Sequence, residues 1–132
     1  MNRRQFLTTG TASLVFPSMS QAQEISGVGV IFIGASWCSF CKRAAPVLAA
    51  MVQPAGIPVL VASHDARPIP PFAEVTDARQ HPVASAITTF PTTLFYSQAE
   101  GAVTSQITGY RNARHYAQSV QAAVLAAARR QS

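Results

Sequence analysis

The sequence has little cysteine and little charge. Cys38 and Cys41 are the two cysteines in 132 residues, too few for the disulfide framework of a small secreted domain. Charged residues make up 11% of the chain and hydrophobic residues 48%, a normal globular share. No internal repeat or second linker divides the sequence. The length therefore predicts one domain with one core of ordinary size.

The N-terminus lacks an apolar run long enough to cross a bilayer, which takes about 20 residues. The apolar stretch Leu7–Pro17 is shorter than that and is diluted by threonine, glycine and serine. Arg3-Arg4 precedes this stretch and Ser20-Gln21-Ala22 follows it. These three parts predict that residues 1–22 are an export signal cleaved near Ala22, and that residues 23–132 are a periplasmic domain without a membrane anchor.

The route of export is indicated by Asn2-Arg3-Arg4-Gln5-Phe6-Leu7. This stretch resembles the twin-arginine signal, in which two arginines are followed by any residue and then Phe-Leu. The resemblance implies export of a folded protein. A general secretory signal that contains Arg-Arg, or a disordered basic N-terminus, are the alternatives.

The sequence also lacks a concentrated basic segment. Loss of residues 1–22 removes two arginines and no acid, so eight basic and five acidic residues remain and the formal charge falls from +5 to +3. The remaining basic residues are scattered, and adjacent pairs occur at Lys42-Arg43 and Arg129-Arg130. Nucleic-acid binders gather such residues on one face, so we expect no nucleic-acid partner.

Hydrophobic periodicity predicts a strand–helix–strand unit followed by a hairpin and a final helix. The first two predicted strands are continuous apolar runs, typical of strands buried on both faces. An apolar stripe at helical spacing lies between them, with a bend expected at Pro46. The predicted elements are strands 28–33, 57–62, 92–96 and 102–108, a helix after Cys41, a loop over 64–81, a short helix over 82–87, and a last helix capped by Asn112.

Cys38-x-x-Cys41 lies where a buried strand passes into a helix, which is a redox placement. Unpaired backbone N–H groups and the positive dipole end at a helix start stabilise a thiolate, so the first sulfur should attack and its neighbour should resolve. A zinc site is the main alternative, but it would need two ligands from His64, His81 and His115, which lack a finger's spacing. A structural disulfide across so short a loop would stabilise the fold little, because it removes little entropy from the unfolded chain.

Three motifs together resemble the thioredoxin superfamily over nearly all of the mature chain. They are Ala35-Ser36-Trp37-Cys38-x-x-Cys41-Lys42, the proline five residues past the second cysteine, and Thr89-Phe90-Pro91-Thr92 before a predicted strand. The resemblance implies that Cys38 is the exposed nucleophile and Cys41 the buried resolving thiol. It also implies a minimal thioredoxin fold of the α/β class, with a four-stranded mixed sheet flanked by helices.

The resemblance further implies four substrate-binding residues. Pro91 would follow a cis peptide bond and face the cysteines, and Phe90 would offer its backbone to an extended substrate segment. Trp37 would pack beside the pair. Gly109, after the last predicted strand, would let the substrate chain approach.

The sequence departs from the family at two places. Phe32 stands where thioredoxin has a buried aspartate that helps to deprotonate the resolving thiol, so we expect slow resolution. Ser39-Phe40 between the cysteines matches neither Gly-Pro of thioredoxin nor Pro-His of the strongly oxidising bacterial enzymes. The redox direction is therefore left open by this dipeptide.

The function predicted from these features is thiol–disulfide exchange with cysteine-containing proteins outside the cytoplasm. We expect a monomer that acts as a reductant, needs no bound cofactor or metal, and receives electrons from a membrane donor, because the exported compartment is oxidising. The alternative is a metallochaperone or assembly factor of the same fold, which would use both thiols to hold a metal or a partner.

Overall fold

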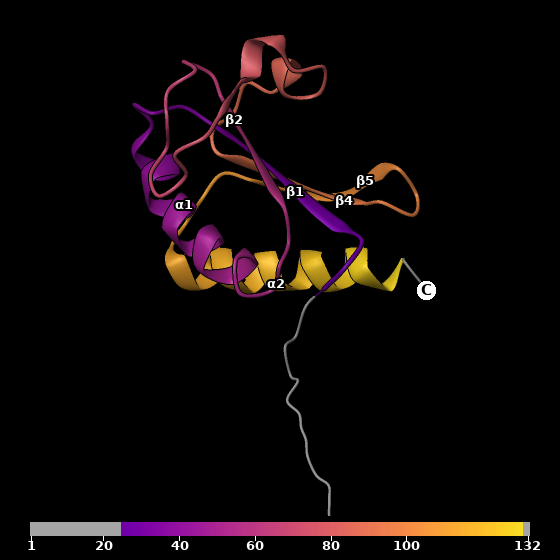
Figure 1. Ribbon diagram of the computed structural model, residues 1–132. Coiled ribbons are helices and arrows are strands. Elements are labelled where there is room, and N and C mark those ends of the chain that lie inside the picture. The colour runs from indigo at the N-terminus through magenta and orange to yellow at the C-terminus, as the bar shows by residue number, and fades with distance from the viewer. Residues whose placement is uncertain (1–24, 131–132) are drawn as a thin grey trace, which may run out of the picture.

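The structure is a computed structural model that describes residues 25–130 (Figure 1). The predicted export signal lies outside the described residues. Within them, no helix is both long and apolar enough to span a bilayer.

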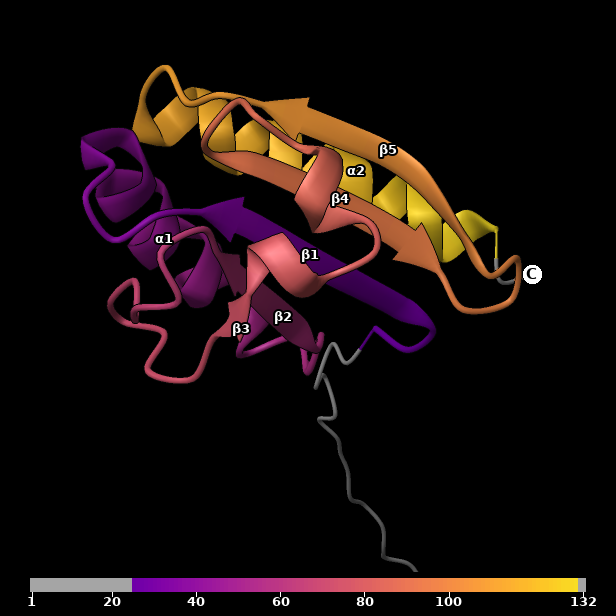
Figure 2. The ribbon, with the colours of Figure 1, turned by 90° about the horizontal axis from the view of Figure 1, so that it is seen from above.

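The described chain folds into one mixed sheet and two long helices (Figures 1 and 2). The sheet order is β3-β2-β1-β4-β5, in which β1 pairs in parallel with β2, β2 with β3, and β4 runs antiparallel to β1 and β5. The elements are β1 (Val28–Gly34), α1 (Ser39–Val52), β2 (Val59–Ser63), β3 (Thr76–Asp77), the 3₁₀ turns η2 (Ala78–Gln80) and η3 (Ala84–Ala86), β4 (Thr92–Ser97), β5 (Ala102–Thr108) and α2 (Ala113–Arg129).

The predicted four-stranded sheet was wrong by one strand. The sheet has five, because Thr76 and Asp77 pair in parallel with Ala62 and Ser63 and extend it at one edge. This strand lies within the region predicted as loop. A strand of two residues has no side-chain alternation to reveal it in the sequence.

The short helix predicted over 82–87 is one 3₁₀ turn, Ala84–Ala86. The imidazole of His81 accepts hydrogen bonds from the backbone N–H groups of Val83 and Ala84, both at 3.1 Å. The ring thus pairs with two backbone N–H groups at the start of the turn, where the N–H groups of a helix have no backbone partner. His81 has this local structural role and lies away from the two cysteines along the chain.

Both long helices pack on the same face of the sheet (Figure 1). Alternate side chains of β1 point to opposite faces, so Val28, Val30 and Phe32 join the core under α1 and α2. Ile33 joins a smaller cluster on the other face, where η2 and η3 lie over part of the sheet (Figure 2).

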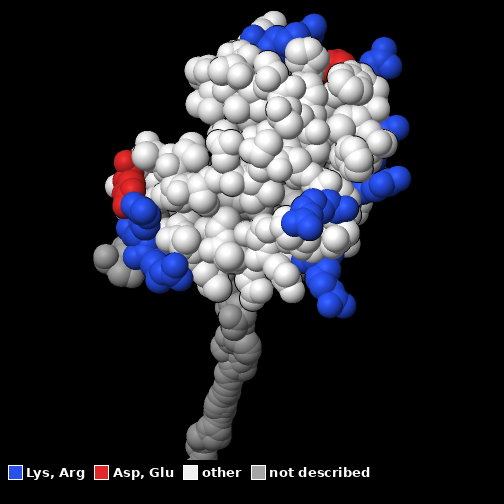
Figure 3. Space-filling view, turned by 180° about the vertical axis from the view of Figure 1, so that it is seen from behind, with Lys and Arg blue, Asp and Glu red and all other residues white. Residues whose placement is uncertain are grey.

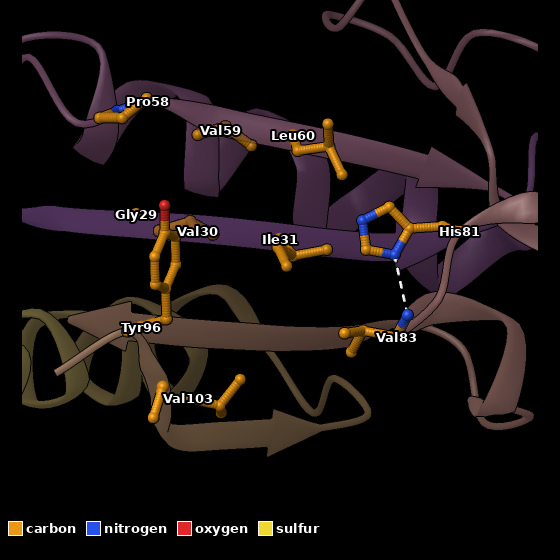
Figure 4. A pocket seen from close by; sticks show the side chains of 12 residues that line it. Gly29, Val30, Ile31, Pro58, Val59, Leu60, His81, Val83, Tyr96 and Val103 are labelled. Carbon is orange, nitrogen blue, oxygen red and sulfur yellow. Dashed lines mark hydrogen bonds between the residues drawn. The ribbon is translucent and has the colours of Figure 1, made fainter. Parts of the chain in front are cut away.

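The rest of that second face holds an apolar hollow of about 520 Å³ (Figure 4). The ring of Tyr96 lies against Gly29, where a Cβ atom would come within 2.3 Å of a ring carbon. Glycine is therefore needed for the ring to lie flat on β1. Ile31, Leu60 and His81 line the hollow further along, and neither cysteine borders it.

One edge of the sheet collects loops from four strands. Gly34 pairs with Ser63, Ile33 with Thr92, and Thr92 with Thr108, so β1, β2 and β5 end where β4 begins. We call this edge, with residues 35–38, 64–67, 89–91 and 109–112, the carboxyl edge. It places segments far apart in the sequence around the start of α1.

Candidate active site

Cys38 is the N-cap residue of α1. Its backbone is extended, with φ −82° and ψ 116°, and its Sγ accepts a hydrogen bond from the backbone N–H of Cys41 at 3.2 Å. A sulfur so placed faces the unpaired N–H groups and the positive end of the helix dipole, which favour a thiolate. The predicted helix-start placement is confirmed.

Cys38 is far less exposed than the family resemblance implies, since only 8% of the residue is accessible. The physical reason is the cap itself, which turns the sulfur over the first helical turn. Trp37, by contrast, is 63% exposed. The residue next to the nearly covered sulfur is thus widely exposed.

Cys41 is fully buried behind Cys38. Gly34 makes room for it, because a Cβ atom at that position would lie 2.7 Å from the Cys41 Sγ. Burial, followed by the hydrogen bond with Cys38, raises the pKa of the Cys41 thiol to about 12. The second sulfur is thus held as a thiol that ionises only with difficulty at neutral pH.

The peptide bond between Phe90 and Pro91 is cis, the form that the family resemblance predicts. The Phe90 ring contacts Trp37 edge to face, with centroids 6.1 Å apart, and also contacts His64, with centroids 5.4 Å apart. His64 is fixed by its backbone N–H, which donates to the Gly34 carbonyl at 2.7 Å. Three rings from three loops therefore line the carboxyl edge beside Cys38.

Gly109 lies next to Pro91 and donates its N–H to the Pro91 carbonyl at 2.7 Å. Its φ of +85° is in the region that favours glycine, and a Cβ atom there would meet nothing within 4 Å. The side of Gly109 that a side chain would occupy is open. The structure thus places Trp37, Cys38, Phe90, Pro91 and Gly109 at the carboxyl edge, and Cys41 in the first turn of α1 behind them.

Asp65 is a site residue that the sequence reasoning missed. One carboxylate oxygen accepts from the Ser36 backbone N–H at 3.1 Å and from the Ser63 hydroxyl at 2.8 Å, and the other accepts from the Ser36 hydroxyl. Asp65 thus fastens the segment just before Trp37 and Cys38 to the end of β2. Its signal in the sequence is weak, since an aspartate after a strand is commonplace in loops.

We expect Asp65→Asn to weaken the hydrogen bonds that hold Ser36 to the end of β2. The free energy of unfolding should then depend less on pH in the acid range. Burial opposes ionisation of Asp65, but the hydrogen bonds from Ser36 and Ser63 outweigh it and hold the pKa below its usual range. Because the folded pKa is depressed, this stabilisation is present above about pH 4 and is lost as the pH falls further.

The measurement is denaturant unfolding of both proteins between about pH 7 and pH 3. At neutral pH the variant should be less stable by about 1–2 kcal/mol, after allowance for solvent screening. The difference should shrink as the pH falls below about 4. A difference that stays constant across this range would contradict the assigned hydrogen bonds.

The chain has a thioredoxin-like fold, with the cysteine pair at the start of α1. Among solved structures, the chain is similar to Malassezia sympodialis thioredoxin (Mala s 13), with 24% identity and a TM-score of 0.51 over 82% of this chain and 81% of that one. It is similar to a Chlorobium tepidum protein named as the thiol:disulfide interchange protein DsbE, with 24% identity and a TM-score of 0.60 over 79% and 82%. It is also similar to MTB dsbF, with 17% identity and a TM-score of 0.54 over 74% and 81%. At these identities the likeness establishes the common fold.

Residues 19–107 match the sequence profile of the TraF family, described as "F plasmid transfer operon protein". The chain belongs to this family. No curated protein sequence matches the chain.

Proposed function

We propose that the protein is a thiol–disulfide oxidoreductase that exchanges the Cys38–Cys41 pair with cysteine-containing proteins outside the cytoplasm. One observation carries this proposal: Cys38 caps a helix at the loop-lined carboxyl edge, and Cys41 is fully buried directly behind it. The likeness in fold to proteins named as thioredoxin and as thiol:disulfide interchange proteins supports it. The TraF family takes its name from the F plasmid transfer operon, so cysteine-containing products of such an operon are the first substrates to test.

The exchange runs in two steps that balance in electrons. The Cys38 thiolate attacks a substrate disulfide, forms a mixed disulfide and releases one substrate thiolate. Cys41 then gives up its proton and attacks the Cys38 sulfur, which releases the second substrate thiol and leaves a Cys38–Cys41 disulfide. Two electrons pass to the substrate, and a dithiol donor, which we propose to be in the membrane, restores the pair.

The proposal is tested by reduction of insulin disulfides with a small dithiol as the electron source. The wild-type protein should accelerate the reduction, and the variant with both cysteines replaced by serine should not. Equal rates for the two proteins would overturn the proposed activity.

A metal-handling role has less support. Within residues 25–130, no group of three or more His, Cys, Asp or Glu side chains lies close enough together to hold a metal ion. The His64 ring packs on the Phe90 side chain. We therefore propose no second function.

We infer that Trp37, Phe90, Pro91 and Gly109 bind the substrate chain, and Gly109→Val tests this. The variant adds side-chain atoms on the open side beside Pro91. Because that space is empty, the expected structural cost is backbone strain of about 1–2 kcal/mol. The rate with a protein disulfide should fall about tenfold or more, as expected when a substrate is misplaced, while the rate with a small disulfide should change little. Equal losses of rate with the protein disulfide and with the small disulfide would show that the variant acts by distorting the cysteine pair.

We also propose that residues 1–22 are an export signal and that the mature chain starts near Gln23. The arginine pair, the apolar stretch and Ser20-Gln21-Ala22 support this reading. Mass spectrometry of the protein from periplasmic extracts should find an N-terminus near Gln23. Recovery of the intact chain from the cytoplasm alone would contradict it.

A further inference from the structure

Five basic residues lie at the carboxyl edge or in the helical turns that adjoin it, although they are scattered in the sequence. Lys42 and Arg43 lie in and just after the first turn of α1, and Arg67 follows the end of β2. Arg111 follows β5, and Arg114 lies in the first turn of α2. Since β1, β2 and β5 all end at this edge, the sheet topology places the five residues at the same end of the sheet. All five are exposed.

Two acidic residues lie at the same end of the sheet, and each has its own hydrogen-bond partners. Asp65 accepts hydrogen bonds from Ser36 and Ser63. Asp77, at the end of β3, forms an ion pair with Arg79 at 2.9 Å. Across residues 25–130 the ion pairs are this one and the pair of Arg130 with Glu100, so none involves the five basic residues.

Aromatic side chains lie among these charges. Trp37 is 63% exposed and Phe40 is 48% exposed, on either side of Cys38 in the sequence. The Arg43 guanidinium lies 5.7 Å from the centre of the Phe40 ring. In Figure 3, several Lys and Arg side chains follow the right-hand margin, which is the side on which α1 and α2 begin. The surface around Cys38 is therefore both apolar and positively charged.

We propose that the carboxyl edge selects cysteine-containing protein segments that carry acidic residues beside an apolar residue. This inference rests on the proposed function and names its substrate class. Exposed opposite charges attract over roughly 10 Å at 0.1 M salt, so the five cations accelerate encounter with an acidic segment. The exposed rings of Trp37 and Phe40 then bury the segment's apolar side chain.

The test uses three peptides that share one cysteine in a mixed disulfide with a small chromophoric thiol, and one apolar neighbour. Their flanks carry acidic, neutral or basic residues. Each reacts with the Cys41→Ser variant, and release of the chromophore reports attack by Cys38. The acidic peptide should react about tenfold faster than the neutral one at low salt and the basic peptide more slowly. The spread should shrink to roughly twofold at 0.5 M salt.

Two charge variants, each in the Cys41→Ser background, separate local from overall charge. Arg111→Gln combined with Arg114→Gln should cut the preference for the acidic peptide to roughly threefold. Arg129→Gln, at the far end of α2, should leave that preference unchanged. If Arg129→Gln reduces the preference as much as the double variant does, the overall charge of the protein sets the preference, and the inference is overturned.

Three further outcomes would overturn the inference. Equal rates for all three peptides would overturn the inference and leave the proposed function standing. No reaction with any peptide would overturn both. A short single-stranded oligonucleotide that blocks the edge at a lower concentration than the acidic peptide would reassign the surface to nucleic acid and overturn the inference.

Discussion

Replacement of Cys41 by serine should trap substrates on Cys38 as stable mixed disulfides, whereas replacement of Cys38 should abolish exchange. The reason lies in the different positions of the two sulfurs. Cys38 caps α1 at the carboxyl edge, and Cys41 is fully buried with a pKa raised to about 12. Loss of an attacking nucleophile typically costs a factor of about 10³ or more in rate. Loss of the resolving thiol should spare the first step and stop the second.

The measurement is non-reducing electrophoresis and mass spectrometry of each variant after incubation with a cysteine-containing protein disulfide. Cys41→Ser should form adducts that a small thiol releases, and Cys38→Ser should form none. Both serine variants must first show wild-type circular dichroism, because both cysteines belong to the core. The reverse pattern of adducts would reverse the assignment of nucleophile and resolving thiol.

Phe32→Asp should speed resolution of the mixed disulfide and destabilise the fold. Phe32 is fully buried in the same core cluster as Cys41, and its ring lies 6.2 Å from that of Phe72. A carboxylate there would offer a base to a thiol that burial keeps protonated. Loss of the ring and burial of an ionisable group should cost about 2–5 kcal/mol.

Single-turnover release from a preformed Cys38 mixed disulfide, between about pH 6 and pH 9, distinguishes the two proteins. The wild-type rate should rise roughly tenfold per pH unit, because the fraction of Cys41 thiolate does so below its pKa of about 12. The variant should be faster near neutral pH and less dependent on pH. If the wild type already shows a shallow profile, another group supplies the base, and His64, beside Phe90, is the first to replace.

The long elements were predictable because their sequence periodicity matches their burial. The continuous apolar runs predicted β1, which is buried along nearly all of its length, and β2, although Leu60 on β2 is 37% exposed. The stripe on α2 includes Tyr116 and Val120, both fully buried. Asn112 caps α2 as predicted, since its side chain accepts from the His115 N–H at 2.8 Å. The two-residue strand β3 was missed because pairing with β2, rather than periodicity, creates it.

Residue patterns alone predicted the site only where it is contiguous in sequence, and Phe90, Pro91 and Gly109 were predicted from the family resemblance. Cys38 and Cys41 are three residues apart, so helix geometry alone brings them together. The contact of Ser36 with Asp65 joins residues 29 apart, and the basic edge joins residues from α1 to α2. Both arise from the strand order, which local patterns do not contain. Adjacency in sequence does not measure adjacency in space.

Thiol–disulfide exchange through Cys38 and Cys41 is tested most directly by a thiol count on the reduced protein before and after one equivalent of a protein disulfide. Two free thiols should disappear from this chain, two should appear on the substrate, and peptide mapping should find a Cys38–Cys41 disulfide. Unchanged thiols on both proteins, with the fold intact, would contradict it.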